Sequence, residues 1–153
     1  MESPLILLVD DDANDEELAR IALEYAAIPH RLQVVRDGVE ALDWLLRRGP
    51  FTDRDPEPAP HLILLDLKLP RLGGLEVLER IRRDARTRLV PVVVFTSSSE
   101  TSDLEEAYRR GANAYVRKPV DFQDYKNLIV DVGTFWIRRN QRPIPERAGG
   151  LST

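Results

Sequence analysis

Hydrophobic residues along the chain fall into short continuous runs separated by longer amphipathic stretches. Three runs, at residues 5–9, 62–65 and 92–95, are unbroken, and each ends at a polar residue. Continuous apolar runs of this length are typical of strands that are buried on both faces of a parallel sheet. Two weaker candidates lie at 32–35 and 114–116. The pattern therefore predicts five strands.

A helix is predicted after each strand, because apolar residues recur there at spacings of three and four. The recurring positions are Leu18, Ile21, Ala22, Tyr25 and Ala26; Val39, Leu42 and Leu46; Leu75, Leu78 and Ile81; Leu104, Ala107 and Tyr108; and Phe122, Tyr125, Leu128, Ile129 and Val132. Asn14 with Glu17, and Asp37 with Glu40, have the spacing of capping boxes. We expect the fifth helix to run to about Trp136. Five strand–helix repeats predict a parallel sheet with right-handed crossovers and helices on both faces.

Two segments lie outside this alternation. Residues 49–60 contain four prolines and are predicted to form a loop before the third strand. The residues after about 136 contain further prolines and a Gly-Gly pair, and are too few to form a domain. We therefore expect one domain over residues 1–136 and a C-terminal tail over residues 137–153.

Composition and charge exclude several classes of function. The 153 residues fit one ordinary domain, and the absence of cysteine excludes disulfides, thiolate zinc sites and thiol nucleophiles. The two histidines, His30 and His61, are too few for a histidine-rich metal site. A net charge of −4 argues against nucleic acid as the main partner. Without a membrane-spanning apolar stretch or a signal peptide, we expect a cytoplasmic protein with no membrane partner.

Polar side chains follow the strands at the points where they end. These residues are Asp10, Asp11 and Asp12 after the first strand, Asp66 after the third, Thr96 and Ser97 at the fourth, and Lys118 and Pro119 after the fifth. In open parallel sheets, ligands bind beyond the carboxyl ends of the strands. We therefore expect carboxylates, a hydroxyl and an ammonium to meet at one edge of the sheet.

The chemistry of that edge follows from its charges. Carboxylates held close together repel one another unless a cation lies between them, and without His or Cys ligands that cation should be hard and oxygen-bound. Mg²⁺ suits such a site, since it keeps several waters and takes one or two carboxylates together with a phosphoryl oxygen. A lysine and a hydroxyl would hold the other phosphoryl oxygens. The pattern indicates phosphoryl transfer onto a carboxylate.

Five motifs, in order along the chain, resemble the receiver domain of two-component response regulators. They are Val9-Asp10-Asp11, Leu65-Asp66, the Leu69-Pro70…Gly73-Gly74 turn, Phe95-Thr96-Ser97 and Lys118-Pro119. The resemblance covers about residues 4–136. It implies a CheY-like, flavodoxin-like (βα)5 fold of the α/β class, a doubly wound five-stranded parallel sheet in the order 2-1-3-4-5. The proline-rich loop, the serine run after Thr96 and the short tail resemble single-domain regulators encoded with bacterial and cyanobacterial phytochromes.

The resemblance also implies a role for each site residue. Asp66 would be the phosphoacceptor, and it would share a Mg²⁺ ion with Asp11, with Asp10 acting through water, and with the backbone carbonyl of Lys68. Thr96 and Lys118 would contact the phosphoryl group.

Two further implications concern conformation. Tyr115 stands where the family has an aromatic switch residue that turns inward when Thr96 moves. The Lys118–Pro119 peptide would be cis.

The implied partner is a histidine kinase, with a phytochrome as the narrower expectation. The protein would then be a phosphoacceptor that assists its own phosphorylation and dephosphorylation, and not an enzyme. A homodimer through the fourth helix, fifth strand, fifth helix and tail is also implied. The adjacent residues Phe135, Trp136 and Ile137 favour such a contact, because three neighbouring side chains cannot all face one core from a helix.

Other interpretations remain open from the residues alone. The aspartates at 10–12 also suit a solvated helix N-terminus, and Tyr115 also suits core packing. The fold alone is compatible with a pseudo-receiver that only binds, with an aspartyl-nucleophile phosphatase, or with a flavin-binding protein. The phosphatase would need a second acid where Lys68 stands, and three aspartates would repel a flavin phosphate.

Overall fold

A five-stranded parallel sheet organises the protein, and its strand order is β2-β1-β3-β4-β5. The structure, a computed structural model, describes residues 3–55 and 59–143. The strands are β1 (Leu5–Val9), β2 (Arg31–Val35), β3 (Leu62–Leu65), β4 (Val92–Thr96) and β5 (Ala114–Arg117). The helices are α1 (Ala13–Tyr25), α2 (Gly38–Leu46), α3 (Gly74–Arg83), α4 (Thr101–Arg109) and α5 (Phe122–Gly133), with a 3-10 turn η1 (Gly49–Phe51) and a π-helical segment η2 (Thr134–Arg139). The predicted fold class and strand order are confirmed.

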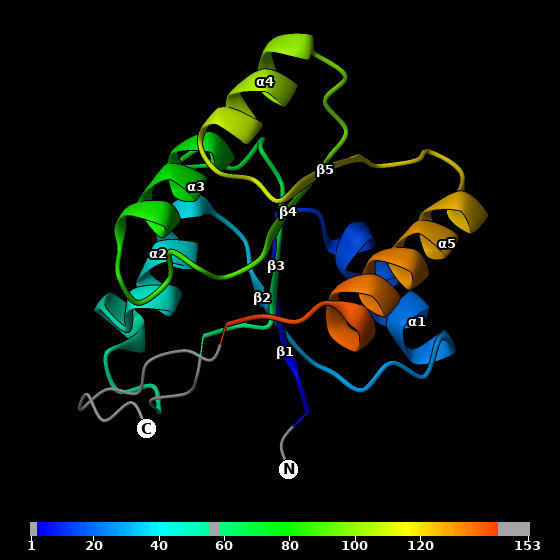
Figure 1. Ribbon diagram of the computed structural model, residues 1–153, viewed down its shortest axis with the longest axis horizontal. Coiled ribbons are helices and arrows are strands. Elements are labelled where there is room, and N and C mark those ends of the chain that lie inside the picture. The colour runs from blue at the N-terminus through cyan, green and yellow to red at the C-terminus, as the bar shows by residue number, and fades with distance from the viewer. Residues whose placement is uncertain (1–2, 56–58, 144–153) are drawn as a thin grey trace.

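Helices cover both faces of the sheet (Figure 1). α1 and α5 lie on one face, and α2, α3 and α4 lie on the other. Successive residues of β1 alternate between the two layers: Ile6 and Leu8 pack toward α1 and α5, whereas Leu7 and Val9 pack toward α2 and α3. Each central strand thus needs apolar residues at every position, which explains the unbroken runs in the sequence.

The register of the sheet brings the carboxyl ends of its strands to one edge. Val9 of β1 pairs with Leu65 of β3, and Leu65 pairs with Val94 of β4. Backbone hydrogen bonding between strands continues one residue beyond the ends of β3 and β5. The Asp66 amide donates to the Val9 carbonyl at 3.0 Å, and the Lys118 amide donates to the Thr96 carbonyl at 2.8 Å. Residues just beyond the strands therefore become neighbours.

The start of α1 differs from the prediction. Asp12, not Asn14, is the N-cap, and its carboxylate accepts hydrogen bonds from the amides of Asn14 at 2.8 Å and Asp15 at 3.4 Å. Two predicted core positions of this helix, Ile21 and Tyr25, are 39% and 69% exposed. The predicted position Ala22 is buried, and it is joined by Ala19 and Leu23, which the predicted spacing did not include. At α2 the predicted cap Asp37 is confirmed, and it accepts from the Glu40 amide at 2.7 Å.

Gly74 lets α3 begin directly against the loop that carries Asp66. A Cβ atom at Gly74 would lie 2.2 Å from the Asp66 carbonyl oxygen and 2.7 Å from the Leu67 Cα, both of which are backbone atoms. The Gly74 amide donates to the Leu67 carbonyl at 2.9 Å. Glycine at this position is thus a packing requirement of the loop after β3.

The C-terminal helix continues beyond its predicted end near Trp136, as the π-helical segment η2. Trp136 and Ile137 pack against the core layer beneath α1 and α5, while Phe135 remains 51% exposed. The expectation that these three side chains cannot share one core is confirmed. The tail residues 144–153, which include most of the expected dimerisation arm, lie outside the described residues. Within the described residues, no helix is both long and apolar enough to cross a membrane.

Candidate functional site

Three carboxylates meet at the edge where β1 and β3 end. Oxygen atoms of Asp10, Asp11 and Asp66 all lie within 4.8 Å of one another. Asp10 is 1% exposed and Asp66 is 8% exposed, whereas Asp11 faces solvent. The edge lies between β1 and β3, where the chain reverses its direction of winding, which is the position at which open α/β sheets bind ligands.

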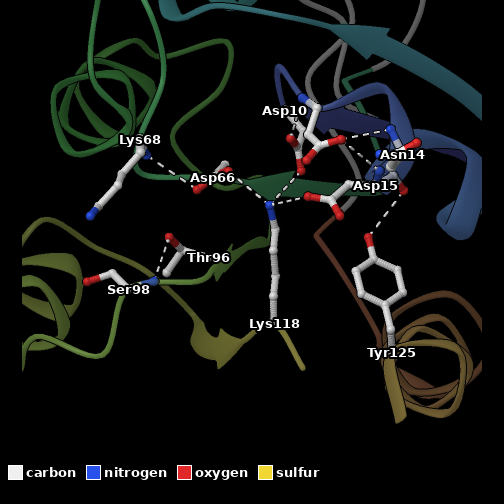
Figure 2. A network of polar contacts seen from close by, with 10 residues as sticks. Asp10, Asn14, Asp15, Asp66, Lys68, Thr96, Ser98, Lys118 and Tyr125 are labelled. Atoms are coloured by element: carbon white, nitrogen blue, oxygen red, sulfur yellow. Dashed lines mark hydrogen bonds and ion pairs between the residues drawn. The ribbon is translucent and has the colours of Figure 1, made fainter. Parts of the chain in front are cut away.

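Lys118 reaches this cluster from the loop after β5 (Figure 2). Its Nζ atom lies 2.8 Å from Asp10 Oδ2, 2.9 Å from Asp66 Oδ2 and 2.7 Å from Asp15 Oδ2. Burial of the lysine opposes its charge, but the hydrogen bonds that it donates to the three carboxylates outweigh burial and raise the pKa of Lys118. The side chain is therefore a fixed ammonium ion beside Asp66.

Asp10 is the most deeply buried carboxylate of the cluster. Burial raises its pKa from the ordinary 3.8 to about 6, although the bonds from Lys118 and from the Asp12 amide at 2.9 Å favour the carboxylate. One ammonium cannot neutralise four neighbouring carboxylates. A second cation would relieve the remaining repulsion.

The donor set fits a hard divalent cation such as Mg²⁺. The cluster contributes only carboxylate oxygens, and the exposed Asp11 leaves room for the water ligands that Mg²⁺ retains. Lys68 presents its amide to Asp66 Oδ1 at 3.3 Å, while its side chain points away from the carboxylates (Figure 2). The metal ligation expected of the Lys68 carbonyl stays a prediction.

Thr96 is the last residue of β4, at the same edge of the sheet. It is fully buried, and its Oγ1 accepts a hydrogen bond from the Ser98 amide at 3.3 Å. Ser98 Oγ in turn donates to Asp103 of α4 at 2.6 Å. The Ser98 carbonyl accepts from the Tyr115 hydroxyl at 3.1 Å. The two residues expected to act as a switch, Thr96 and Tyr115, are therefore joined through Ser98, which the sequence analysis did not single out.

A pocket of about 360 Å³ lies beside Asp66 and Lys118. Its lining consists of Asp11, Asp12, Asp15, Asp66, Lys68, Ser97, Lys118, Pro119 and Val120. The expected cis peptide before Pro119 is wrong, because the described residues contain no cis peptide bond. The trans isomer is intrinsically favoured by about 0.5–1 kcal/mol. The residues Phe135, Trp136 and Ile137 lie on η2, away from this edge.

Comparison with known proteins agrees with this geometry. The family model described as "Response regulator receiver domain" matches residues 6–130. The response regulator Rcp1 of Synechocystis is 35% identical over 133 residues, which are 87% of this chain and 88% of Rcp1. A crystal structure of its Mn²⁺-bound form superposes with a TM-score of 0.84 and 34% identity, covering 92% of this chain and 99% of that one.

Two solved phytochrome regulators are also similar. The phosphorylated cyanobacterial phytochrome response regulator RcpA has a TM-score of 0.86 and 32% identity, with 94% and 99% of the two chains covered. The bacteriophytochrome response regulator RtBRR has a TM-score of 0.71 and 47% identity, with 94% and 85% covered. With this sheet and this acidic edge, the chain belongs to the response regulator receiver domain family of two-component signalling.

Proposed function

We propose that the protein accepts a phosphoryl group on Asp66 from the phosphohistidine of a histidine kinase, with Mg²⁺ as the cofactor. The observation that carries this proposal is the arrangement at Asp66, whose Oδ2 lies 2.9 Å from the Lys118 ammonium and beside the carboxylates of Asp10 and Asp11. The nucleophile Asp66, the ammonium of Lys118 and the expected metal ligand Asp11 line one open pocket.

The proposed reaction is an in-line displacement at phosphorus. A carboxylate oxygen of Asp66 forms the new P–O bond while the P–N bond to the kinase imidazole breaks, and the imidazole nitrogen takes the electron pair. Asp11, Asp66 and the Lys68 carbonyl, with Asp10 acting through water, would hold Mg²⁺, which would supply positive charge to the phosphoryl oxygens. Lys118 pairs with one phosphoryl oxygen and the Thr96 hydroxyl donates to another.

We further propose that phosphorylation is transmitted to the face formed by α4, β5 and α5. Thr96 is coupled to α4 and β5 through Ser98, so a Thr96 hydroxyl that turns to the phosphoryl group changes the bonds of this loop. α4 is lightly packed, with Ala107 its buried residue and Leu104 and Tyr108 38% and 51% exposed. This face and the tail are the proposed homodimer contacts.

The similarity to RcpA and RtBRR supports a phytochrome as the kinase partner. No observation favours the binding-only or phosphatase alternatives. At the position where a phosphatase would carry its second acid, Lys68 turns its exposed side chain away from Asp66.

The direct test is incubation with acetyl phosphate and Mg²⁺, followed by intact-mass measurement. We expect a gain of one phosphoryl group in the parent and none in Asp66→Asn or in the presence of EDTA. An Asp66→Asn variant that gains the same mass would overturn the proposal. Sedimentation with and without beryllofluoride tests the dimer separately, since identical association constants would contradict coupling.

A further inference from the structure

Lys118 has a third carboxylate partner besides Asp10 and the acceptor. Asp15, in the first turn of α1, places its Oδ2 2.7 Å from the Lys118 Nζ, the shortest of the three ion pairs. Asp15 does not belong to the carboxylate cluster suited to a metal, which within the described residues is formed by Asp10, Asp11 and Asp66. Its partner is the ammonium (Figure 2).

The backbone of Asp15 is held from two sides. The Asp12 cap accepts from its amide at 3.4 Å, and the Tyr125 hydroxyl of α5 donates to its carbonyl at 3.2 Å. Tyr125 is 3% exposed and packs edge-on against Phe95 at a centroid distance of 5.3 Å. Hydrogen bonds thus fix the backbone of Asp15, and 18% of its side chain is exposed.

The number of hydrogens on the ammonium determines what Asp15 does during phosphoryl transfer. A lysine has three N–H donors, and Asp10, Asp15 and Asp66 occupy all three. When Asp66 becomes an acyl phosphate, it loses its own charge and its hold on the ammonium weakens. That donor can pass to a phosphoryl oxygen, while Asp10 and Asp15 keep theirs.

We propose that Asp15 is a positioning residue that holds the Lys118 ammonium in place for the phosphoryl group, a role that rests on the proposed function of Asp66. Asp10 is shared between the lysine and the metal cluster. Asp15 is therefore the carboxylate that fixes Lys118 independently of the metal. Its removal leaves the acceptor and the metal ligands intact but frees the ammonium to move.

The initial rate of phosphorylation by acetyl phosphate tests this role, with Asp15→Ala, Asp15→Asn and Glu17→Ala compared at saturating Mg²⁺. Glu17 is an exposed acid on the same helix and is the matched control for charge. If removal of a negative charge acted only by reducing repulsion of the anionic acetyl phosphate, both alanine variants would be phosphorylated faster than the parent. Positioning predicts instead that Asp15→Ala is about tenfold slower, in line with the loss of one charge-assisted hydrogen bond. Asp15→Asn, which keeps an acceptor oxygen, should be intermediate, and Glu17→Ala should be no slower than the parent.

A second comparison separates positioning from a general structural role. In a Lys118→Ala background, Asp15→Ala should change the remaining rate by less than about twofold, because there is no ammonium left to hold. A slowing of the same size in both backgrounds, or a parent-like rate in Asp15→Ala alone, would overturn the inference. If the parent is phosphorylated and Asp15→Ala is phosphorylated at the same rate, only the role of Asp15 is refuted. If the parent accepts no phosphoryl group, the proposed function is refuted and this role with it.

Discussion

The Tyr115 hydroxyl donates a hydrogen bond of 3.1 Å to the backbone carbonyl of Ser98. This bond joins the edge strand β5 to the loop between β4 and α4, and the amide of the same serine donates to Thr96 at 3.3 Å. Tyr115 and Thr96 are therefore both hydrogen-bonded to Ser98. Under the proposed function, a change at the Thr96 hydroxyl would reach the edge strand through this one residue.

Tyr115→Phe should weaken that route and leave the acceptor chemistry intact. Loss of one hydrogen bond predicts a decrease of about 0.5–1.5 kcal/mol in the free energy of unfolding. The rate of phosphorylation of Asp66 should stay within about twofold of the parent rate, because the Tyr115 hydroxyl bonds to the Ser98 carbonyl and not to a site carboxylate. Urea unfolding and acetyl phosphate assays measure the two quantities. Tyr108→Phe, which changes an exposed tyrosine on α4, is the control, and an equal loss of stability in it would contradict the prediction.

The two glycines at the start of α3 should respond very differently to alanine. A methyl group at Gly74 meets the Asp66 carbonyl oxygen at 2.2 Å, whereas one at Gly73 meets its nearest atom, the Leu67 carbonyl oxygen, at 3.8 Å. We expect Gly74→Ala to lower the unfolding free energy by about 1–3 kcal/mol or more, and to slow phosphorylation by displacing the acceptor loop. Gly73→Ala should cost less than about 1 kcal/mol. Similar losses in both variants would refute the packing argument.

Affinity for Mg²⁺ should depend on pH through Asp10. Burial raises the pKa of this carboxyl to about 6, so its protonated form competes with the metal as the pH falls. We expect affinity, measured by calorimetry, to change little above about pH 7 and to weaken toward tenfold per pH unit well below 6. In Asp10→Asn the affinity is lower throughout, and this component of the pH dependence disappears. A parent whose affinity is constant from pH 7 to pH 5 would contradict the prediction.

The sequence indicated the edge residues because unbroken apolar runs of four or five residues favour strands buried on both faces, and parallel register then aligns the ends of such strands. Asp10, Asp66, Thr96 and Lys118 could all be assigned to one site on that basis. Asp15 could not, since acids in a first helical turn are equally favoured by the helix dipole and by solvent. The role proposed for Asp15 depends on Lys118, which is 103 residues away in the sequence. It also depends on the distance between α1 and the loop after β5.

The rotation of α1 could not be predicted for a related reason. The spacing of apolar residues suggested a face containing Ile21, Ala22 and Tyr25, but of these three only Ala22 is buried, together with Ala19 and Leu23. Alanine carries little hydrophobic signal, although it allows a helix to approach the sheet closely. Contact with the sheet and with α5 therefore helps to decide which stripe of α1 is buried.

Beyond the opposite edge of the sheet, His61 links the tail to the start of β3. Its Nε2 lies 2.7 Å from an Arg142 guanidinium nitrogen, and its Nδ1 lies 3.3 Å from the Leu5 amide. Both neighbours are N–H donors, so a protonated ring could accept from neither. Burial, together with the positive charges of Arg142 and Arg31, lowers the pKa of His61.

This arrangement predicts a pH dependence of stability with a definite sign. Since the folded pKa lies below the unfolded value of about 6.5, the unfolded state binds the proton more tightly in that range. Stability should therefore rise with pH up to about 6.5 and lose this dependence above it. The test is urea unfolding between pH 5 and pH 8, with Mg²⁺ absent and His61→Gln as the comparison. The difference in unfolding free energy between parent and variant should grow in favour of the parent as the pH rises toward about 6.5. A difference that stays constant or shrinks would show that the folded protein accepts a proton on His61 as readily as the unfolded chain does.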